Sequence, residues 1–250
     1  MSSLISIVGA GPGDSELLTV KALKRIQEAD IILHDALVSN EILNLARPDV
    51  QRIYVGKIYQ DGQNQTGRQE WINQLLIDLS EKGQKIVRLK SGDPMIFGRG
   101  AEEIRFCIEK KLSYEVIPGV TSALAAASLY GIPLTERGKN SMVLFGTGHY
   151  AEGEFLDLDT FISVLKSGSP IIIFMGLNKL IQLATKLIEQ SVSGDTSVLI
   201  LSKVSQSNAT AVEGTLETIA RVIESKKPAM PSLIIIGKNV VKLNKLNGRG

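Results

Sequence analysis

Short apolar runs alternate with segments of helical periodicity through the first half of the chain, and this alternation constrains the fold more than any other feature. The runs Leu4–Val8, Asp30–His34, Ile86–Leu89 and Tyr114–Ile117 have the length of buried strands. Between the first two, apolar residues of Thr19–Ala29 recur at helical spacing. Alternating strands and helices predict a parallel sheet, because parallel strands need crossover connections. We therefore expect an α/β fold.

A segment rich in glycine, proline and charge, residues 131–139, separates this half from a second group of apolar runs. Such a segment is typical of a domain boundary. After it, strands are expected at Ser141–Phe145, Ile171–Phe174, Thr196–Leu201, Ala209–Glu213 and Leu233–Gly237. We predict two α/β domains, residues 1–134 and 135–250, for which a chain of 250 residues is long enough.

Composition argues against several classes of function. A net charge of +2 is too small to indicate a nucleic-acid partner. Two histidines and one cysteine are too few for a multi-ligand His/Cys metal site, so no metal is expected. No apolar run approaches the roughly 20 residues that span a bilayer, and the N-terminus lacks the basic region of a signal peptide. The single Cys107, expected to face the core from a helix, fits a reducing compartment, and we expect a cytoplasmic protein without a membrane partner.

The first strand ends in a glycine-containing loop, Gly9–Ser15, of a kind that allows close approach of a ligand. Gly9 and Gly11 match two positions of the dinucleotide-binding fingerprint, but Asp14 occupies the third. An aspartate there repels a diphosphate, and Pro12 removes a backbone N–H. Three interpretations remain open: a nicotinamide nucleotide, a tight structural turn, and a nucleoside ligand without phosphate. S-adenosylmethionine is such a ligand, and the third interpretation fits best.

A second loop, Ser91–Pro94, follows a strand and leads through Gly98–Gly100 into a predicted helix. Open α/β folds bind ligands where strands end in such loops, although Ser-Gly-Asp-Pro is also ordinary turn chemistry. Arg99 and Glu102 are three residues apart, so on a helix they share a face. They are explained either as a substrate-binding pair or as a surface ion pair.

Further motifs follow in order along the chain, namely Asp35–Ser39, Val55–Lys57, Ile117–Ser122, Gly131–Thr135, Thr147–His149 and Met175–Gly176. Together with the two loops, this set resembles the tetrapyrrole methylases over nearly the whole chain. Within that family it is most similar to members that methylate uroporphyrinogen III, an anionic tetrapyrrole, with S-adenosylmethionine. The resemblance implies a cofactor in the cleft between the two domains, substrate contacts from the first domain, and a homodimer with contacts from the second.

The reaction that the resemblance implies is the transfer of two methyl groups, to C2 and C7, giving precorrin-2 by way of precorrin-1. Precorrin-2 leads to sirohaem and, in some organisms, to cobalamin or haem d1. S-adenosylhomocysteine is the second product. The chain starts at the methylase itself, so no fused dehydrogenase or ferrochelatase domain is expected.

Site residues are also implied by the resemblance. The cofactor set comprises Pro12, Ser91, Gly92, Asp93, Ile96, Thr121, Ser122, Met175 and Val204, and the catalytic candidates are Asp35, Lys57, Arg99, Glu102 and Arg137. Asp35 and Lys57 correspond to the family's proposed proton acceptor and donor. Arg99 with Glu102 is expected to bind substrate and remove a proton, while Arg137 holds a second carboxylate. Without the resemblance, Asp35 is equally well explained as a cap, Lys57 as a solvated lysine and Met175 as core filling.

Other functions stay open beside this one. The first is a sister enzyme of the same fold that acts on a later corrin precursor, and the second is a ribosomal-RNA or protein methyltransferase of related architecture. The third is a regulator that binds the cofactor without chemistry. The motif Phe97–Glu103 favours uroporphyrinogen III as substrate, and the mild charge disfavours RNA. Three positions depart from the family pattern, Ala36, Ser91 and Gln65, and residues 58–67 are expected to form a mobile loop longer than usual.

Overall fold

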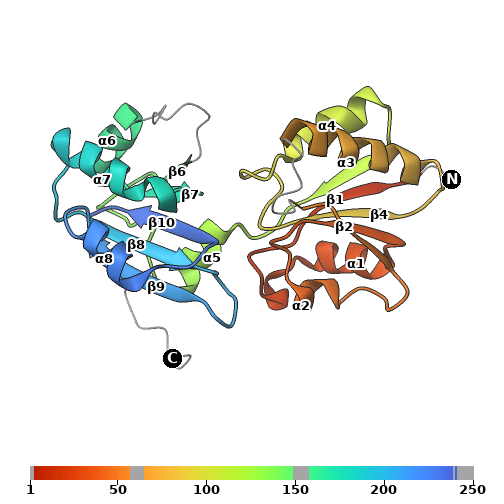
Figure 1. Ribbon diagram of the computed structural model, residues 1–250, viewed down its shortest axis with the longest axis horizontal. Coiled ribbons are helices and arrows are strands. Elements are labelled where there is room, and N and C mark those ends of the chain that lie inside the picture. Colours follow the sequence, from red (N-terminus) through yellow and green to blue (C-terminus); the bar gives the residue numbers. More distant parts are fainter. Residues whose placement is uncertain (1–2, 57–64, 149–157, 239, 241–250) are drawn as a thin grey trace. The chain divides into compact units, whose positions relative to one another are not determined.

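The computed structural model describes residues 3–56, 65–148, 158–238 and 240. The chain divides into two compact units, Met1–Thr121 and Ser122–Gly250, each built on a five-stranded sheet (Figure 1). The expected boundary after residue 134 differs from this division in assigning helix α5 (Ser122–Leu129) and the segment after it to the first domain. The domain limits 1–134 and 135–250 therefore remain a proposal.

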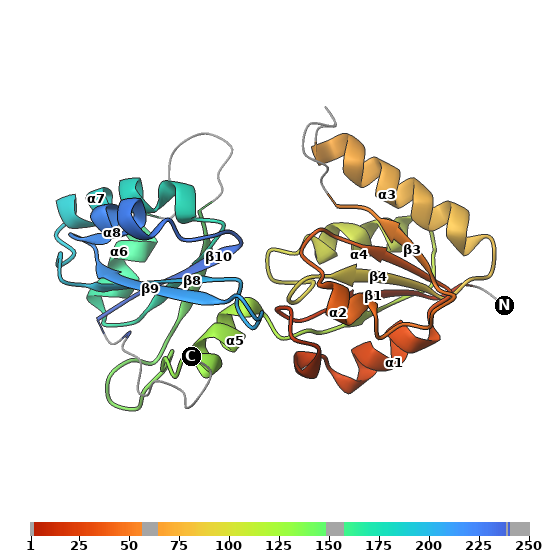
Figure 2. The ribbon, with the colours of Figure 1, turned by 60° about the horizontal axis from the view of Figure 1, so that its bottom comes forward.

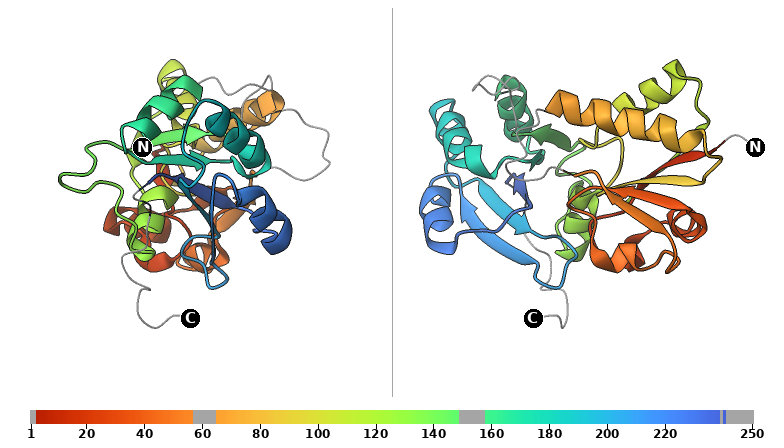
Figure 3. Two further views of the ribbon diagram at one scale, coloured as in Figure 1. Left: turned by 90° about the vertical axis from the view of Figure 1, so that its left-hand side faces the viewer. Right: turned by 45° about the vertical axis from the view of Figure 1, so that its right-hand side comes forward.

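The first sheet is entirely parallel, as the alternation of strands and helices predicted. Its strand order is β3-β2-β4-β1-β5. The strands are β1 (Ile5–Gly9), β2 (Ile31–His34), β3 (Gln51–Tyr54), β4 (Ile86–Lys90) and β5 (Tyr114–Ile117). Helices α1 (Val20–Glu28) and α2 (Asn40–Leu43) cover one face, and α3 (Gln65–Ser80) and α4 (Gly100–Glu109) cover the other (Figures 1 and 3).

Alternate residues of the central strands supply the two cores of this unit. Ile5 and Ile7 of β1 pack among buried residues of α3 and α4, whereas Val8 packs with Ile26 of α1 on the opposite face. Cys107 lies in the first of these cores with no exposed surface, which confirms its predicted position. Burial raises the pKa of its thiol to about 11, so the cysteine is a core residue and not a nucleophile.

The second sheet is mixed, with the order β6-β7-β10-β8-β9. Its strands are β6 (Leu144–Thr147), β7 (Ile171–Phe174), β8 (Ser197–Ser202), β9 (Thr210–Thr215) and β10 (Ser232–Ile236). Strand β6 is parallel to β7, and β10 is antiparallel to both β7 and β8. Strands β6, β7 and β8 therefore end at the same edge of the sheet.

Three helices, α6 (Leu158–Lys166), α7 (Leu180–Glu189) and α8 (Ile219–Lys226), pack on one side of this sheet (Figure 2). Helix α6 was not anticipated from the sequence. Strand β6 begins later than the expected strand Ser141–Phe145 and continues beyond it through Gly146. The phenyl ring of Phe161 explains the glycine, because a Cβ there would lie 2.8 Å from a ring carbon.

Helix α3 starts at Gln65, inside the segment expected to be a loop, so the prediction for residues 65–67 is wrong. Helical structure therefore includes the last three residues of the expected loop. The rest of that segment, residues 58–64, lies outside the described residues, and so does Lys57 before it. No helix of the described ranges is both long and apolar enough to cross a membrane.

Candidate functional site

The predicted site residues of the first unit lie at one edge of its sheet, where the parallel strands end. Pro12 follows β1, Asp35 follows β2, Ser91 follows β4 and Thr121 follows β5. Ligands of open α/β sheets bind at this carboxyl edge. Lys57, which follows β3 in sequence, lies outside the described residues. The topology thus brings together residues from four separate motifs.

Glycines bring the loops after β1, β4 and β5 into backbone contact. Gly11 and Gly92 exchange two hydrogen bonds, with N···O distances of 3.2 and 2.7 Å. A Cβ at Gly119 would lie 2.2 Å from the carbonyl oxygen of Gly92, and one at Gly9 would lie 2.5 Å from the nitrogen of Gly119. Because these neighbours are backbone atoms, only glycine fits. We call Gly9, Gly92 and Gly119 the glycine platform.

Alanine at Gly119 is expected to lower the free energy of unfolding by about 2 kcal/mol, because the added methyl group forces rigid backbone segments apart. Gly138→Ala is the matched control, since nothing lies within 4 Å of a Cβ there and only its positive φ of 82° opposes the change. Chemical denaturation measures both. Equal losses in the two variants would mean that the platform tolerates a side chain.

The Asp93 carboxylate accepts hydrogen bonds from both the loop after β4 and the loop after β5. Oδ1 accepts a hydrogen bond from the Met95 nitrogen at 2.8 Å, and Oδ2 accepts one from the Gly119 nitrogen at 3.0 Å. Each oxygen retains a second lone pair, so the expected contact with the cofactor stays a proposal. The structure adds a role that the sequence did not indicate, which is to hold the loop after β5 against the loop after β4.

Replacing Asp93 with alanine is expected to weaken cofactor binding about 10-fold and to lower the free energy of unfolding by about 2 kcal/mol, because two charge-assisted hydrogen bonds are lost. Calorimetric titration with S-adenosylhomocysteine measures the first effect, and chemical denaturation the second. The exposed Asp49, replaced in the same way, serves as the control. An unchanged dissociation constant would rule out the cofactor role, even if the stability falls.

The loop after β1 does not lead straight into a long helix. Asp14 accepts a hydrogen bond from the Glu16 nitrogen at 2.9 Å and caps the short 3₁₀ helix Ser15–Leu17. Helix α1 begins only after Thr19, whose hydroxyl caps it. A dinucleotide fingerprint requires the helix N-terminus directly at the glycine loop, where it meets the diphosphate. The arrangement therefore favours a ligand without a diphosphate.

A buried cluster of charged side chains connects Asp35 to helix α4. The Arg88 Nη2 lies 2.8 Å from Asp35 Oδ1, and its Nε lies 3.1 Å from Glu103 Oε1. Lys90 Nζ lies 2.9 Å from the same Glu103 oxygen. We call Asp35, Arg88, Lys90 and Glu103 the charge cluster. Of these four residues, only Asp35 was predicted as a site residue. Two cations, Arg88 and Lys90, at alternate positions of an otherwise apolar strand could have indicated the charge cluster.

The members of the charge cluster differ in how burial acts on them. Burial lowers the pKa of Arg88, but Glu103 and Asp35 outweigh this and hold the pKa above its ordinary value. For Lys90 the effect of burial, reinforced by the charge of Arg88, lowers the pKa in spite of Glu103. Two carboxylates balance two cations, so the cluster as a whole is neutral.

Arg99 and Glu102 form a bidentate ion pair at the start of α4. The distances are 3.0 Å from Nε to Oε1 and 2.6 Å from Nη2 to Oε2. The pairing agrees with their predicted proximity, but Arg99 is the N-cap residue of α4 with a φ of 60°, so it lies before the helix and not on its face. The hydrogen bonds to Glu102 raise the pKa of Arg99, and the hydrogen bonds from Arg99 lower the pKa of Glu102. A guanidinium held in its charged form does not accept a proton, so Arg99 is suited to binding and not to base catalysis.

Residues other than glycine with a left-handed backbone are concentrated in loops that contain predicted site residues. Eight described residues other than glycine have a positive φ. Three of them lie within two residues of the C-terminal ends of helices α4, α7 and α8, where left-handed caps are ordinary. The other five are in loops after β4, β7 and β8, namely Phe97, Arg99, Met175, Lys203 and Ser205. Such backbone strain is concentrated at functional sites.

In the second unit, Met175 follows β7 and Val204 follows β8, at the shared edge of the sheet. Met175 is 55% exposed, so it does not fill the core. Val204 is buried between the two strained residues Lys203 and Ser205, and contact with a ligand there would come from the backbone. Gly148 packs against Gly176, where a Cβ would lie 2.3 Å from the neighbouring Cα.

The remaining predicted residues lie on turns and element starts. Ser122 is the first residue of α5, and Ile96 donates its N–H to the Asp93 carbonyl at 3.3 Å. Arg137 is exposed on a tight turn that Asn140 closes by accepting from the Glu136 nitrogen at 3.0 Å. This turn presents the Arg137 guanidinium to solvent, as a residue that binds an anionic ligand requires.

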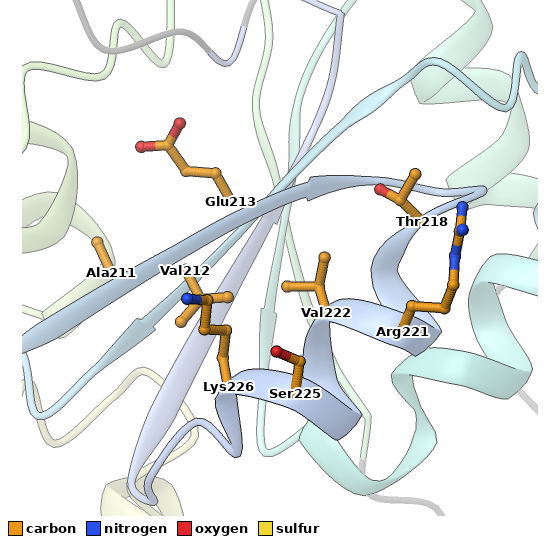
Figure 4. Close-up of a pocket in the computed structure, with 8 residues that line it drawn as sticks. All are labelled: Ala211, Val212, Glu213, Thr218, Arg221, Val222, Ser225 and Lys226. Carbon is orange, nitrogen blue, oxygen red and sulfur yellow. The ribbon is translucent and has the colours of Figure 1, made fainter.

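An open pocket of about 660 Å³ lies between β9 and α8 (Figure 4). Its lining consists of Ala211, Val212, Glu213, Thr218, Arg221, Val222, Ser225 and Lys226. None of the predicted site residues is among them. Across the described part of the chain, no group of histidine, cysteine, aspartate and glutamate has the arrangement of a metal site.

Comparison with known proteins identifies the class to which this fold and site belong. Residues 4–220 match the family of Tetrapyrrole (Corrin/Porphyrin) Methylases. The chain therefore belongs to the tetrapyrrole methylases, and the resemblance seen in the sequence is confirmed.

Particular relatives narrow the comparison. The chain is 42% identical to Uroporphyrinogen-III C-methyltransferase of Bacillus subtilis over 95% of its own length and 90% of that protein. It is 42% identical to Siroheme synthase of Psychrobacter arcticus over 96% of its length, but it spans only 43% of that longer protein. Uroporphyrin-III C-methyl transferase from Thermus thermophilus, solved with S-adenyl homocysteine, is 34% identical with a TM-score of 0.78, covering 95% of this chain and 93% of that one.

Proposed function

We propose that this protein transfers methyl groups from S-adenosylmethionine to C2 and C7 of uroporphyrinogen III, giving precorrin-2 by way of precorrin-1. One observation supports the proposal above all. The glycine platform, Asp35 and the Arg99–Glu102 pair lie at the same edge of a parallel sheet in a tetrapyrrole methylase. Similarity to the Bacillus subtilis and Thermus thermophilus proteins supports uroporphyrinogen III as the substrate. A homodimer in the cytoplasm that serves sirohaem or cobalamin synthesis is part of the same proposal.

The cofactor is proposed to bind the loops that follow the strands. Its residues would be Pro12, Ser91, Gly92, Asp93, Ile96, Thr121, Ser122, Met175 and Val204. The glycine platform holds the loops after β1, β4 and β5 in direct backbone contact, so the proposed cofactor residues of these loops lie close together. When bound, the sulfonium of S-adenosylmethionine supplies an electrophilic methyl group. Thus the protein need not create a strong electrophile of its own.

Substrate carboxylates are proposed to bind Arg99 and Arg137. Glu102 uses the Nε and Nη2 of Arg99, so Nη1 keeps its N–H groups for a substrate oxygen. Charge-assisted hydrogen bonds of this kind fix the direction of a carboxylate as well as its position. The ion pair with Glu102 then holds the guanidinium in place before the substrate arrives, which reduces the entropy lost on binding.

Proton transfer is assigned to Asp35 and Lys57. A ring carbon of the electron-rich substrate forms the new bond to the methyl carbon while the sulfur–methyl bond breaks and its electrons return to sulfur. The ring system then loses a proton, for which the half-exposed Asp35 carboxylate is the proposed acceptor. Each transfer releases one net proton, which passes from Asp35 to solvent. Lys57 is the proposed donor in the accompanying shift of ring protons, in which each proton added is matched by a further proton removed. Two such cycles complete the reaction.

Incubation with uroporphyrinogen III and isotopically labelled S-adenosylmethionine tests the proposed function. Mass spectrometry is expected to show the substrate with one and then two added methyl groups. Calorimetry with S-adenosylhomocysteine is run in parallel. A protein that binds S-adenosylhomocysteine but adds no methyl group to uroporphyrinogen III would refute this substrate.

A further inference from the structure

Arg88 is held on all sides in the interior of the first unit. Its side chain is 3% exposed, and each of its three guanidinium nitrogens has a partner. Nη2 donates to Asp35, Nε donates to Glu103, and Nη1 donates to the Leu89 carbonyl at 3.1 Å. A planar group with three fixed nitrogens has no remaining rotational freedom. Its orientation therefore fixes the position of any carboxylate attached to it.

Stability alone does not account for this cluster. Glu103 is completely buried, and its Oε2 lacks a hydrogen-bond partner among the described residues. Buried ion pairs recover little of their desolvation cost, and apolar residues of similar volume are often at least as stable. A cluster of four charged side chains inside an otherwise apolar layer therefore calls for another explanation.

The exposed fractions of the four side chains show which member of the charge cluster reaches solvent. Arg88, Lys90 and Glu103 have side-chain exposures of 3%, 5% and 0%, whereas Asp35 reaches 32%. The cluster thus ends in a single carboxylate that faces solvent, at the sheet edge where the site residues gather. One oxygen of that carboxylate, Oδ1, is taken by Arg88. No side chain among the described residues donates a hydrogen bond to the other oxygen, Oδ2, which is the oxygen assigned to accept a proton.

We propose that Arg88 is a positioning residue for methyl transfer: it fixes Asp35 through Oδ1 so that Oδ2 meets the substrate, and Glu103 with Lys90 holds Arg88 in place. This inference rests on the proposed function of Asp35. Arg88 touches neither substrate nor cofactor and acts only through Asp35. Its effect must consequently vanish when Asp35 has lost its own function.

A double-mutant cycle tests this dependence. Arg88→Lys keeps the charge, but a single ammonium group on a shorter side chain cannot reproduce the planar contacts to Asp35 and Glu103. We expect kcat for methylation of uroporphyrinogen III to fall about 10-fold. KM and the dissociation constant of S-adenosylhomocysteine are expected to stay within about threefold. In an Asp35→Asn background, the same change is expected to alter kcat less than twofold.

The outcomes separate the inference from the function on which it rests. If Arg88→Lys lowers kcat 10-fold again in the Asp35→Asn background, Arg88 acts independently of Asp35 and the inference is wrong. A wild-type protein that does not methylate uroporphyrinogen III removes the proposed function and the inference together. Where Arg88→Lys fails to fold by circular dichroism, Glu103→Gln is used instead and must show the same dependence on Asp35.

Discussion

Replacing Asp35 with asparagine is expected to lower kcat for methyl transfer about 1,000-fold, because the amide keeps the hydrogen bond from Arg88 but cannot accept a proton. The fold is expected to persist, since asparagine is close in size and still offers an acceptor oxygen to the guanidinium. Single-turnover assays with labelled S-adenosylmethionine measure the rate, and calorimetry measures S-adenosylhomocysteine binding. Binding is expected to remain within twofold of the wild-type value.

The matched control for this variant is Asp49→Asn. Asp49 has an exposed side chain that forms an ion pair with Arg47 at 3.7 Å, so its loss is expected to be neutral. If Asp35→Asn turns over as fast as the control, Asp35 is not the proton acceptor. Another group, or solvent, must then take the proton, and the charge cluster would have no catalytic purpose.

Removing the guanidinium of Arg99 is expected to lower kcat about 100-fold and to leave S-adenosylhomocysteine binding nearly unchanged, because the methyl acceptor loses its alignment. The variant is Arg99→Ala, compared with Arg105→Ala on helix α4, whose N-cap is Arg99. Arg105 is exposed and carries the same charge, so it controls for the general loss of positive potential. Steady-state kinetics with uroporphyrinogen III, together with calorimetry, distinguishes the two roles.

A parallel loss of cofactor binding in Arg99→Ala would assign the residue to the cofactor or to the structure of the loop. The effect on loop structure needs its own test, because Arg99 has a φ of 60° and alanine is no better suited to that conformation than arginine. Arg99→Gly resolves it, since glycine adopts this φ freely. If glycine restores turnover that alanine lacks, the backbone and not the guanidinium is responsible.

The sheet of the first unit could be predicted from the sequence because its information is local. Apolar runs such as Asp30–His34 are separated by helical periodicity, and this alternation is sufficient to indicate parallel strands. The second sheet was harder to derive. Strand β10 pairs antiparallel with β8, and β8 pairs antiparallel with β9, a direction that apolar runs do not encode. Helix α6 was missed although Phe161, Ile162 and Leu165, which it buries, recur at helical spacing.

The candidate site likewise combines features that the sequence indicates with contacts that only the folded chain produces. Gly92 and Asp93 are marked by turn chemistry, and Arg99 with Glu102 by helical spacing, so the sequence indicates each pair by itself. The hydrogen bond from Gly119 to Asp93 joins residues 26 positions apart, and no local pattern contains it. The exposure of Met175 is equally a result of the folded chain, because an apolar side chain beside a strand suggests burial.

By itself, the sequence determined the class of fold, the family and the loops where ligands bind, because short-range patterns of apolar residues, glycine and proline govern these features. Only the tertiary structure decided which side chains meet. Asp35 and Arg88 are 53 residues apart in sequence, yet neighbouring parallel strands bring them within 2.8 Å. Pairing of that kind depends on strand order and register, which long-range packing sets. The buried charge cluster behind Asp35 is accordingly a property of the fold and not of any one motif.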